Sequence, residues 1–361
     1  MIRLLVVDDS PLMRRLLGDL FAAEGDFEVS FARNGAEALA ALASVRPDVI
    51  TLDVQMPEMD GLECLDRIML QRPTPVVMAS AVTVEGAAEA LRALDLGAVD
   101  VIAKPSGAVS LRMDEFGPPL VEKVRAAAQA RLPSAHRLRE RIRARRAPAT
   151  VGTAPADGRR RRVGPAIPRE GEGLIVVGCS TGGPSALDAL LEPLPATLPW
   201  PVVVAQHMPA TFTGALARRL DGLTALTVVE LRQPTRLAAG VVYIARGDAD
   251  MIVSRRGRDL VAMSAPADPR FRWHPSVDRL VDSALDQMPA DRIVGVLMTG
   301  MGDDGAAAMT RVFQAGGHVL AESEATAVVW GMPGALVRAG GASVVADVDD
   351  LAAALVGAFA P

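Results

Sequence analysis

Short apolar runs that alternate with amphipathic helical patterns constrain the fold of this chain more than any other feature. In residues 1–125, five β-like runs occur at 2–7, 28–32, 48–53, 75–80 and 99–103. Helical patterns follow them near 11–24, 35–44, 60–71, 84–96 and 114–130. Parallel strands need crossover connections, which helices usually supply. The alternation therefore predicts an α/β unit built on a five-stranded parallel sheet.

The same alternation resumes near residue 173. Apolar runs such as LIVVGC, PVVVAQ and DRIVGVLMT alternate with helical patterns near 184–192, 211–220, 277–288, 304–315 and 333–339. Between residues 241 and 264 the runs are short and separated by turn residues, which favours an antiparallel hairpin there. We therefore expect a second, doubly wound and mostly parallel α/β domain that carries a short antiparallel hairpin.

The segment between the two units has a different composition. Its second part is rich in Pro, Gly, Ala and Arg and cannot bury a core. We therefore predict α/β domains over 1–125 and 172–361, joined over 126–171 by an Arg/Pro/Gly-rich linker whose start can extend the preceding helix.

Composition excludes several classes of protein. No apolar run approaches the roughly 20 residues that a membrane span needs. The first apolar run is too short for a signal peptide and ends in acid. The two cysteines, Cys64 and Cys179, fall in different predicted domains and imply no disulfide framework. We expect a soluble, cytoplasmic protein that is not embedded in a membrane.

A basic stretch raises the question of nucleic acid. Residues 131–170 hold 12 Arg and three acidic residues, whereas the whole chain has a net charge of −5. The stretch has no interleaved aromatic residues and the rest of the chain is acidic, which argues against a nucleic-acid-binding face. A protein whose output is binding through this stretch remains an alternative.

Acidic and polar residues follow the predicted strands of the first unit. The carboxyl ends of parallel strands face the crevice where α/β proteins bind ligands. Converging carboxylates repel one another unless a cation such as Mg²⁺ neutralises them, and a lysine there can bind a phosphoryl oxygen. The residues placed at this edge are Asp8, Asp9, Asp53, Ser80 and Lys104, the last followed by Pro105.

The motifs VVDDS, LDVQMPEMDG and AKP resemble the response-regulator receiver domain, which has a flavodoxin-like fold. The resemblance implies that Asp53 accepts a phosphoryl group and that Ser80 and Lys104 sense it. It also implies a Mg²⁺ site formed by Asp8, Asp9, Asp53 and the backbone carbonyl of Gln55. Receivers usually carry an aromatic switch residue three positions before the lysine, where this chain has Val101.

In the second unit, the run LIVVG leads into the turn CSTGGPSAL. Ser180 lies in this Gly-rich turn, and Pro184 suits the first turn of the helix that follows. The N-terminus of that helix offers N–H groups to a developing oxyanion. The letters also match the G-x-S-x-G nucleophile elbow, so Ser180 is a candidate nucleophile. A serine in such a turn can also be a helix cap or a small spacer.

A nucleophilic serine needs a base, and the chain contains four histidines. His136 lies in the linker, His274 in FRWHPS, and His318 begins an apolar strand where a structural role is expected. His207 directly follows the strand VVVAQ, at the same sheet edge as Ser180. We therefore predict His207 as the base.

The loop GMGDDG, residues 300–305, allows two interpretations. Its glycines match the dinucleotide fingerprint, and Glu322 or Glu324 could serve as the acid about 20 residues further on. Asp303 and Asp304 would repel a pyrophosphate, however, and an acid here could instead orient His207. We favour the triad interpretation and keep an NAD-dependent enzyme as an alternative.

The motifs GCSTGG, AQHMP, TGMGDDGAAAM and ATAVVWGMPGA resemble the catalytic domain of chemotaxis protein-glutamate methylesterases, the CheB family. The resemblance implies that Ser180 is the nucleophile, His207 the general base and acid, and Asp304 the orienting carboxylate. Backbone N–H groups of Thr181 and Met301 are the implied oxyanion donors.

The family resemblance also implies an activity and its partners. The enzyme would hydrolyse glutamate γ-methyl esters on the cytoplasmic helices of chemoreceptors, release methanol and deamidate specific receptor glutamines. A chemotaxis histidine kinase would donate the phosphoryl group, with Mg²⁺ in the receiver and no cofactor for the esterase chemistry. Alternatives are the same chemistry on another methylated protein, or a receiver with a non-enzymatic output.

Overall fold

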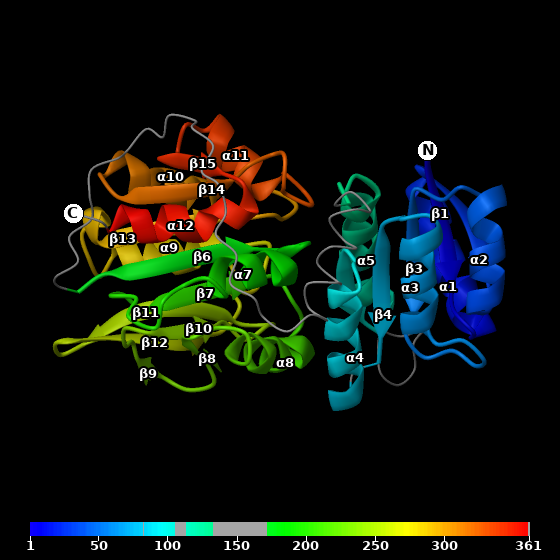
Figure 1. The fold of residues 1–361 in the computed structure, drawn as a ribbon, viewed down its shortest axis with the longest axis horizontal. Coiled ribbons are helices and arrows are strands. Elements are labelled where there is room, and N and C mark those ends of the chain that lie inside the picture. The colour runs from blue at the N-terminus through cyan, green and yellow to red at the C-terminus, as the bar shows by residue number, and fades with distance from the viewer. Residues whose placement is uncertain (82, 105–112, 133–171, 360–361) are drawn as a thin grey trace, which may run out of the picture.

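The computed structural model describes residues 1–81, 83–104, 113–132 and 172–359, which form two α/β units (Figure 1). The N-terminal unit comprises β1 to β5 and α1 to α5, and the C-terminal unit begins at β6. His136 and most of the predicted linker lie outside the described residues.

The N-terminal unit has the predicted five-stranded parallel sheet, in the order β2-β1-β3-β4-β5. Its strands are β1 (Ile2–Val7), β2 (Phe27–Ala32), β3 (Val49–Asp53), β4 (Val76–Ser80) and β5 (Asp100–Ala103). Its helices are α1 (Pro11–Glu24), α2 (Gly35–Ser44), α3 (Gly61–Gln71), α4 (Val84–Asp95) and α5 (Met113–Ala128). Each strand precedes a helix, as the sequence pattern predicts.

Capping residues and apolar stripes explain how these helices are placed. The side chains of Asn34, Asp60 and Thr83 each accept a backbone N–H at the start of a helix, which satisfies a donor that has no partner within the helix. Buried residues of α1 and α5 form one apolar cluster on one face of the sheet, and those of α2, α3 and α4 pack on the other face.

The C-terminal unit is built on a seven-stranded parallel sheet in the order β15-β14-β13-β6-β7-β10-β8. Its strands are β6 (Leu174–Cys179), β7 (Val202–Gln206), β8 (Thr227–Glu230), β10 (Val241–Ile244), β13 (Ile293–Leu297), β14 (His318–Glu322) and β15 (Val344–Ala346). After β6, the strands β7, β8 and β10 are added on one side of it, and the later strands β13, β14 and β15 are added on the other side. This reversal of strand order creates a crevice beside β6, where open α/β sheets bind ligands.

Helices cover both faces of this sheet (Figure 1). They are α7 (Gly183–Leu191), α8 (Ala210–Asp221), α9 (Val277–Leu285), α10 (Ala306–Gln314), α11 (Met332–Arg338) and α12 (Val348–Ala358). The helix α12 is additional to the predicted pattern. It is apolar around most of its circumference and packs against α7 and β14, so it lacks the amphipathic periodicity that marks a surface helix.

The predicted antiparallel hairpin is narrower than the 241–264 range. It consists of β11 (Asp250–Arg256) and β12 (Asp259–Ala265), and β9 (Thr235–Arg236) adds a third antiparallel strand. The strand β10 instead pairs in parallel with β7 and β8 and belongs to the main sheet. Its short length made it look like a hairpin strand, because strand direction depends on partners that are distant in sequence.

The helix α4 of the first unit packs against α7 and α8 of the second (Figure 1). Arg219 of α8 pairs with Asp95 of α4 at 2.6 Å. The Gly182 N–H donates to the carbonyl of Val99 at 3.1 Å. These contacts place the loop before β5 directly against the turn that follows β6.

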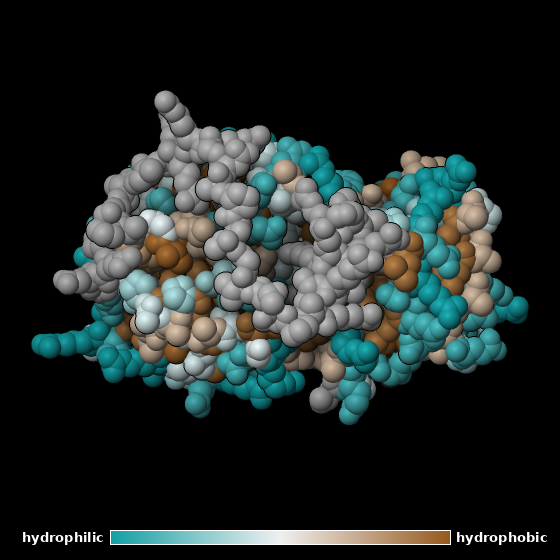
Figure 2. Space-filling view, in the orientation of Figure 1, coloured by the Kyte–Doolittle hydropathy of each residue, from teal (hydrophilic) through white to brown (hydrophobic). Residues whose placement is uncertain are grey.

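The visible surface is mixed in polarity. Figure 2 shows polar residues along the outer edges of both units, with smaller apolar patches among them. None of the described helices combines the length and the apolar character needed to cross a membrane.

Candidate functional site

The turn after β6 presents Ser180 beside the N-terminus of α7. Ser180 is largely buried, and its N–H donates to the carbonyl of Thr299 at 2.9 Å. Gly182 has a φ of +80°, and a Cβ there would lie 2.6 Å from the Cβ of Val328. Only glycine therefore fits this turn. Pro184 occupies the first turn of α7, as predicted.

Gln206, the last residue of β7, supports this turn from the neighbouring strand. Its Nε2 donates to the carbonyls of Ser180 at 2.9 Å and of His207 at 3.1 Å. Its Oε1 accepts from the Cys179 thiol at 3.0 Å. Cys179 is buried, and burial raises the pKa of its thiol, which keeps it protonated and inert. No sequence pattern indicates this role, because a glutamine at the end of a strand resembles any other polar residue there.

His207 and Asp304 meet across the β6 edge. His207 follows β7, Asp304 lies in the loop after β13, and β6 lies between these two strands. The His207 Nε2 lies 2.8 Å from the Asp304 Oδ2, and both side chains are largely buried. Sequence pattern placed Ser180, His207 and Asp304 at strand ends, and the strand order brings all three to one place.

Asp304 is held by the segment that begins α9. Its carboxylate accepts the Val277 N–H at 2.7 Å, the Asp278 N–H at 3.0 Å and the Ser276 hydroxyl at 3.1 Å. Burial raises the pKa of the Asp304 carboxyl, but His207 and these N–H donors outweigh burial and hold the pKa below its ordinary value. Asp304 is therefore an ionised group with a fixed orientation.

The free nitrogen of His207 is Nδ1. It is buried and has no hydrogen-bond partner within the part of the chain that the structure describes. With the Nε2 proton donated to Asp304, Nδ1 carries the lone pair that can accept a proton. The geometry therefore places the Asp304 contact on Nε2 and leaves Nδ1 able to accept a proton, the reverse of the arrangement in chymotrypsin-like triads.

Trp273 covers the imidazole of His207. The two rings stack with centroids 5.3 Å apart and planes 14° apart. Trp273 lies in the same segment as His274, and the stretch FRWHPS indicated only a histidine there. A stack of this kind depends on the fold of the loop between β12 and α9, so sequence pattern could not find it.

The loop GMGDDG carries Asp304 toward His207. Gly305 has a φ of +86°, and a Cβ there would lie 2.5 Å from the Val277 Cγ1. Asp303 is exposed, so the two acids differ in role. Glu322, the acid that the dinucleotide interpretation requires, is buried and accepts the Thr299 N–H at 2.7 Å. These contacts favour the triad interpretation of the loop.

The expected oxyanion donors flank the serine. Thr181 directly follows Ser180, and a Cβ on Gly300, which precedes Met301, would lie 2.8 Å from the Ser180 Cβ. Among the described residues, the N–H groups of Thr181 and Met301 donate no hydrogen bond. Both loops thus bring backbone N–H groups to the serine.

Two other histidines are engaged elsewhere. The His274 Nδ1 lies 3.0 Å from the buried carboxylate of Asp250, which also accepts the Ser276 N–H at 2.8 Å. His318 begins β14, and burial lowers the pKa of its imidazole. His318 thus has the environment that a structural role predicts.

In the N-terminal unit, the carboxylates of Asp8, Asp9 and Asp53 converge at the carboxyl ends of β1 and β3. Each offers an oxygen within 4.8 Å of the others. The Lys104 Nζ lies 2.7 Å from both Asp8 and Asp53. Burial would lower the pKa of Lys104, but the two carboxylates outweigh burial and raise the pKa. This all-oxygen donor set fits a hard cation such as Mg²⁺.

The other predicted residues of this pocket lie around it. The Gln55 N–H donates to the Asp53 Oδ1 at 3.3 Å, which places the Gln55 backbone beside the Asp53 carboxylate. The Ser80 hydroxyl is buried and donates to the carbonyl of Gly86 at 2.8 Å. Val101 is fully buried in the apolar core next to α4.

Comparison with known proteins identifies both units. Residues 175–355 match the CheB methylesterase family model, and residues 4–113 match the response regulator receiver domain model. The chain is 55% identical over 361 residues to "Protein-glutamate methylesterase/protein-glutamine glutaminase 2" of Rhodopseudomonas palustris, covering 99% of this chain and 98% of that protein. It is 50% identical over 356 residues to a protein of the same name, numbered 3, of Rhodospirillum rubrum, covering 98% and 95%.

A solved structure agrees with these matches. The crystal structure of the Thermotoga maritima CheB methylesterase catalytic domain covers 52% of this chain and 99% of its own, with 35% identity and a TM-score of 0.50. The chain therefore belongs to the CheB methylesterase family, with a response regulator receiver domain preceding its methylesterase domain.

Proposed function

We propose that this protein is a phosphorylation-regulated serine esterase that hydrolyses glutamate γ-methyl esters of chemoreceptors in the cytoplasm and deamidates specific receptor glutamines. The observation that carries the proposal is the placement of Ser180 and a His207–Asp304 pair at the ends of neighbouring strands, where Gln206 binds the Ser180 and His207 carbonyls and the His207 Nδ1 accepts no hydrogen bond within the described residues. The names of the relatives support the same activity.

The geometry supports an acyl-transfer mechanism. The His207 Nδ1 takes the proton of the Ser180 hydroxyl as the Ser180 oxygen attacks the ester carbonyl. The N–H groups of Thr181 and Met301 stabilise the oxyanion. His207 then protonates the departing methoxide, which leaves as methanol. A water that gives its proton to His207 then attacks the acyl-enzyme carbonyl, and His207 returns that proton to the Ser180 oxygen as the bond to the acyl group breaks and the glutamate side chain is released. With a glutamine substrate, ammonia leaves instead.

The receiver supplies the regulation in this proposal. Asp53 accepts a phosphoryl group from a histidine kinase, and Ser80 and Lys104 respond to it. Asp8, Asp9, Asp53 and the Gln55 carbonyl would hold Mg²⁺, which would supply positive charge beside the phosphoryl group. The Thr181 hydroxyl donates to the Asp100 carboxylate at 2.7 Å, so the receiver contacts the residue next to the nucleophile. This contact joins β5 of the receiver to the turn that carries Ser180.

The test is methanol release from methylated receptor. Ser180→Ala should reduce release to background, whereas Asp53→Ala should keep the basal rate and lose its increase on phosphorylation. Demethylation that continues unchanged in Ser180→Ala would contradict the nucleophile assignment. Equal rates before and after phosphorylation of the unsubstituted protein would contradict the regulation.

A further inference from the structure

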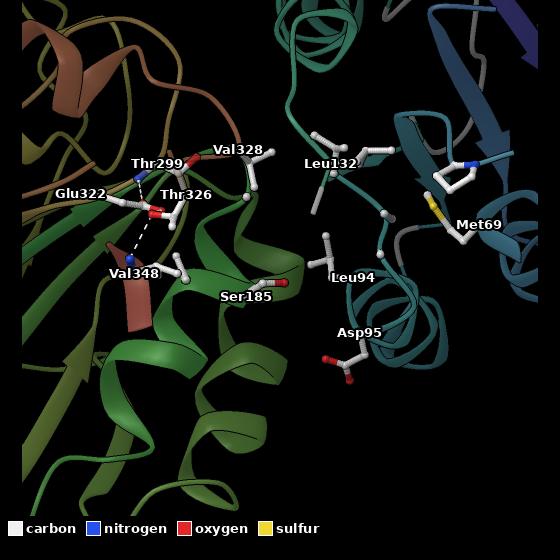
Figure 3. A pocket seen from close by; sticks show the side chains of 16 residues that line it. Met69, Leu94, Asp95, Leu132, Ser185, Thr299, Glu322, Thr326, Val328 and Val348 are labelled. Carbon is white, nitrogen blue, oxygen red and sulfur yellow. Dashed lines mark hydrogen bonds between the residues drawn. The ribbon is translucent and has the colours of Figure 1, made fainter. Parts of the chain in front are cut away.

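A buried acid lies beside the nucleophile turn without taking part in the mechanism above. Glu322 is the last residue of β14, and its side chain is 1% exposed. It lines a cavity between the two units, with Leu94, Asp95 and Leu132 on the receiver side (Figure 3). Among the described residues, no lysine, arginine or histidine forms an ion pair with Glu322.

Both carboxyl oxygens of Glu322 accept hydrogen bonds. The Oε2 accepts the Thr299 N–H at 2.7 Å, and the Oε1 accepts the Thr326 hydroxyl at 3.1 Å (Figure 3). The Thr326 oxygen in turn accepts the Val348 N–H at 3.0 Å. The Glu322 carboxyl thus ties the end of β13 to the start of α12.

Thr299 passes this restraint to the nucleophile turn. Its carbonyl accepts the Ser180 N–H at 2.9 Å, and its hydroxyl donates to the Thr181 carbonyl at 2.8 Å. The same hydroxyl accepts the Val329 N–H at 2.9 Å. Thr299 therefore connects Glu322 to the backbone of Ser180 and to that of Thr181, an expected oxyanion donor.

We propose that Glu322 is a positioning residue for Ser180, which fixes the nucleophile turn through Thr299 and holds it more firmly when its carboxyl is ionised. This inference rests on the proposed esterase function. An ionised acceptor forms a shorter and stronger bond with a backbone N–H than a neutral one does. The orientation of a nucleophile affects rate steeply, so a looser Thr299 should lower kcat more than it changes KM.

The surroundings of Glu322 make both protonation states accessible near neutral pH. Burial raises the pKa of its carboxyl to about 7, while the Thr299 N–H and the Thr326 hydroxyl oppose the rise. The acidic groups facing it are Asp347 and Asp349 near the start of α12, which add to the rise. Asp95 lines the same cavity, and the Cys179 thiol of β6 lies near enough to be influenced by Glu322.

The experiment compares Glu322→Gln and Glu322→Ala with the unsubstituted full-length chain. Methanol release gives kcat and KM across pH 5.5 to 8.5, and the rate of labelling by a fluorophosphonate reports Ser180 reactivity without any receptor. Glu322→Ala should lower kcat and the labelling rate about tenfold with little change in KM. Glu322→Gln should restore most of the activity at low pH, because its amide oxygen still accepts the Thr299 N–H.

The pH profile separates positioning from a merely structural role. The kcat of the unsubstituted protein should rise as pH increases through about 7, and the kcat of Glu322→Gln should lack this rise. Any change of kcat with pH that comes from titration of the triad should appear in both proteins. Asp350→Asn removes an exposed negative charge from the first turn of α12 and should match the unsubstituted protein. If Glu322→Ala does not fold, the Glu322→Gln profile decides.

Two results would overturn the inference: an unchanged labelling rate in folded Glu322→Ala, or superimposable pH profiles for Glu322→Gln and the unsubstituted protein. Failure of the proposed function looks different. In that case Ser180 would label in the unsubstituted protein and not in Ser180→Ala, but methylated receptor would yield no methanol from either.

Discussion

The indole of Trp273 lies face to face with the imidazole of His207, with the ring centroids 5.3 Å apart. The guanidinium of Arg272 lies over the Trp273 ring at 5.4 Å, and the same arginine pairs with Glu122 of the receiver. The stack fixes the plane of the imidazole and excludes water from one of its faces. It also places an electron-rich ring against the imidazolium that forms during catalysis.

Trp273→Ala should therefore lower kcat. An aromatic pair contributes about 0.5–1.5 kcal/mol beyond burial, which corresponds to a loss of about two- to thirteenfold in rate. Trp273→Phe should lose less, because a smaller ring can still stack. Methanol release at saturating methylated receptor measures the effect. Phe271→Ala, two residues away in the same loop, is the control, and an equal effect of both substitutions would contradict a specific role for the stack.

Asp304→Asn should reduce kcat by about 10⁴, because a carboxamide can donate to Nε2 and drive the imidazole proton onto Nδ1, the nitrogen that must act as the base. Asn keeps the shape of Asp, and with its NH2 group toward Nε2 it loses the hydrogen bond from the Val277 N–H and keeps those from Ser276 and Asp278. Steady-state methanol release and fluorophosphonate labelling of Ser180 measure the loss. Asp303→Asn provides the matched control on the exposed neighbour and should stay within about twofold of the unsubstituted rate. Comparable losses of kcat in the two variants would contradict the assignment of Asp304 as the residue that orients His207.

Much of this architecture follows from local sequence patterns. Strand–helix alternation and Gly-rich turns are local features, and they predicted both parallel sheets and the strand-end positions of Ser180, His207 and Asp304. Strand order is a tertiary property, so the sequence did not show that β6 lies between β7 and β13. The resemblance to the methylesterase family supplied the roles that position alone left open.

The supporting residues could not be predicted for the same reason. Gln206, Thr299 and Glu322 act through hydrogen bonds to residues far away in the sequence. Sequence pattern suggests Glu322 only as the acid of a dinucleotide site, because an acid at the end of a strand has no local signature of burial. The tautomer of His207 also depends on which nitrogen reaches Asp304, which only the folded geometry defines.

In the proposed regulation, the unphosphorylated receiver restrains the esterase by docking on the methylesterase domain, so Asp95→Ala should raise the basal esterase activity of the unphosphorylated protein. The substitution removes the ion pair with Arg219 across the two units, while Arg219 keeps its contact with Asp188. A partly exposed pair contributes about 1 kcal/mol or less, so the increase should not exceed about fivefold. Methanol release before and after phosphorylation measures it. Asp19→Ala, on α1 away from this interface, should have no such effect, and equal basal rates in the two variants would argue against docking as the restraint.

Glu322→Gln should stabilise the methylesterase domain at alkaline pH. The unfolded carboxyl has a pKa of 4.5, whereas burial raises its folded pKa to about 7, so the folded state binds the extra proton between these values. The free energy of unfolding contributed by Glu322 therefore falls as pH rises from 4.5 to 7 and stays low above that range. Between these two pH values the free energy of unfolding contributed by Glu322 falls by roughly 3 kcal/mol. The Gln side chain has no charge, so the free energy of unfolding of Glu322→Gln should not show this fall.

Tryptophan fluorescence can follow this transition selectively, because Trp200, Trp273 and Trp330 all belong to the methylesterase domain. Urea unfolding at pH 5 and at pH 8 should show Glu322→Gln gaining stability relative to the unsubstituted protein only at the higher pH. Asp350→Asn, which removes an exposed charge on α12, should show no comparable gain. If the two proteins differ by the same free energy of unfolding at both pH values, Glu322 is ionised at both. The two hydrogen bonds from Thr299 and Thr326 would then have to offset the cost of burying its charge.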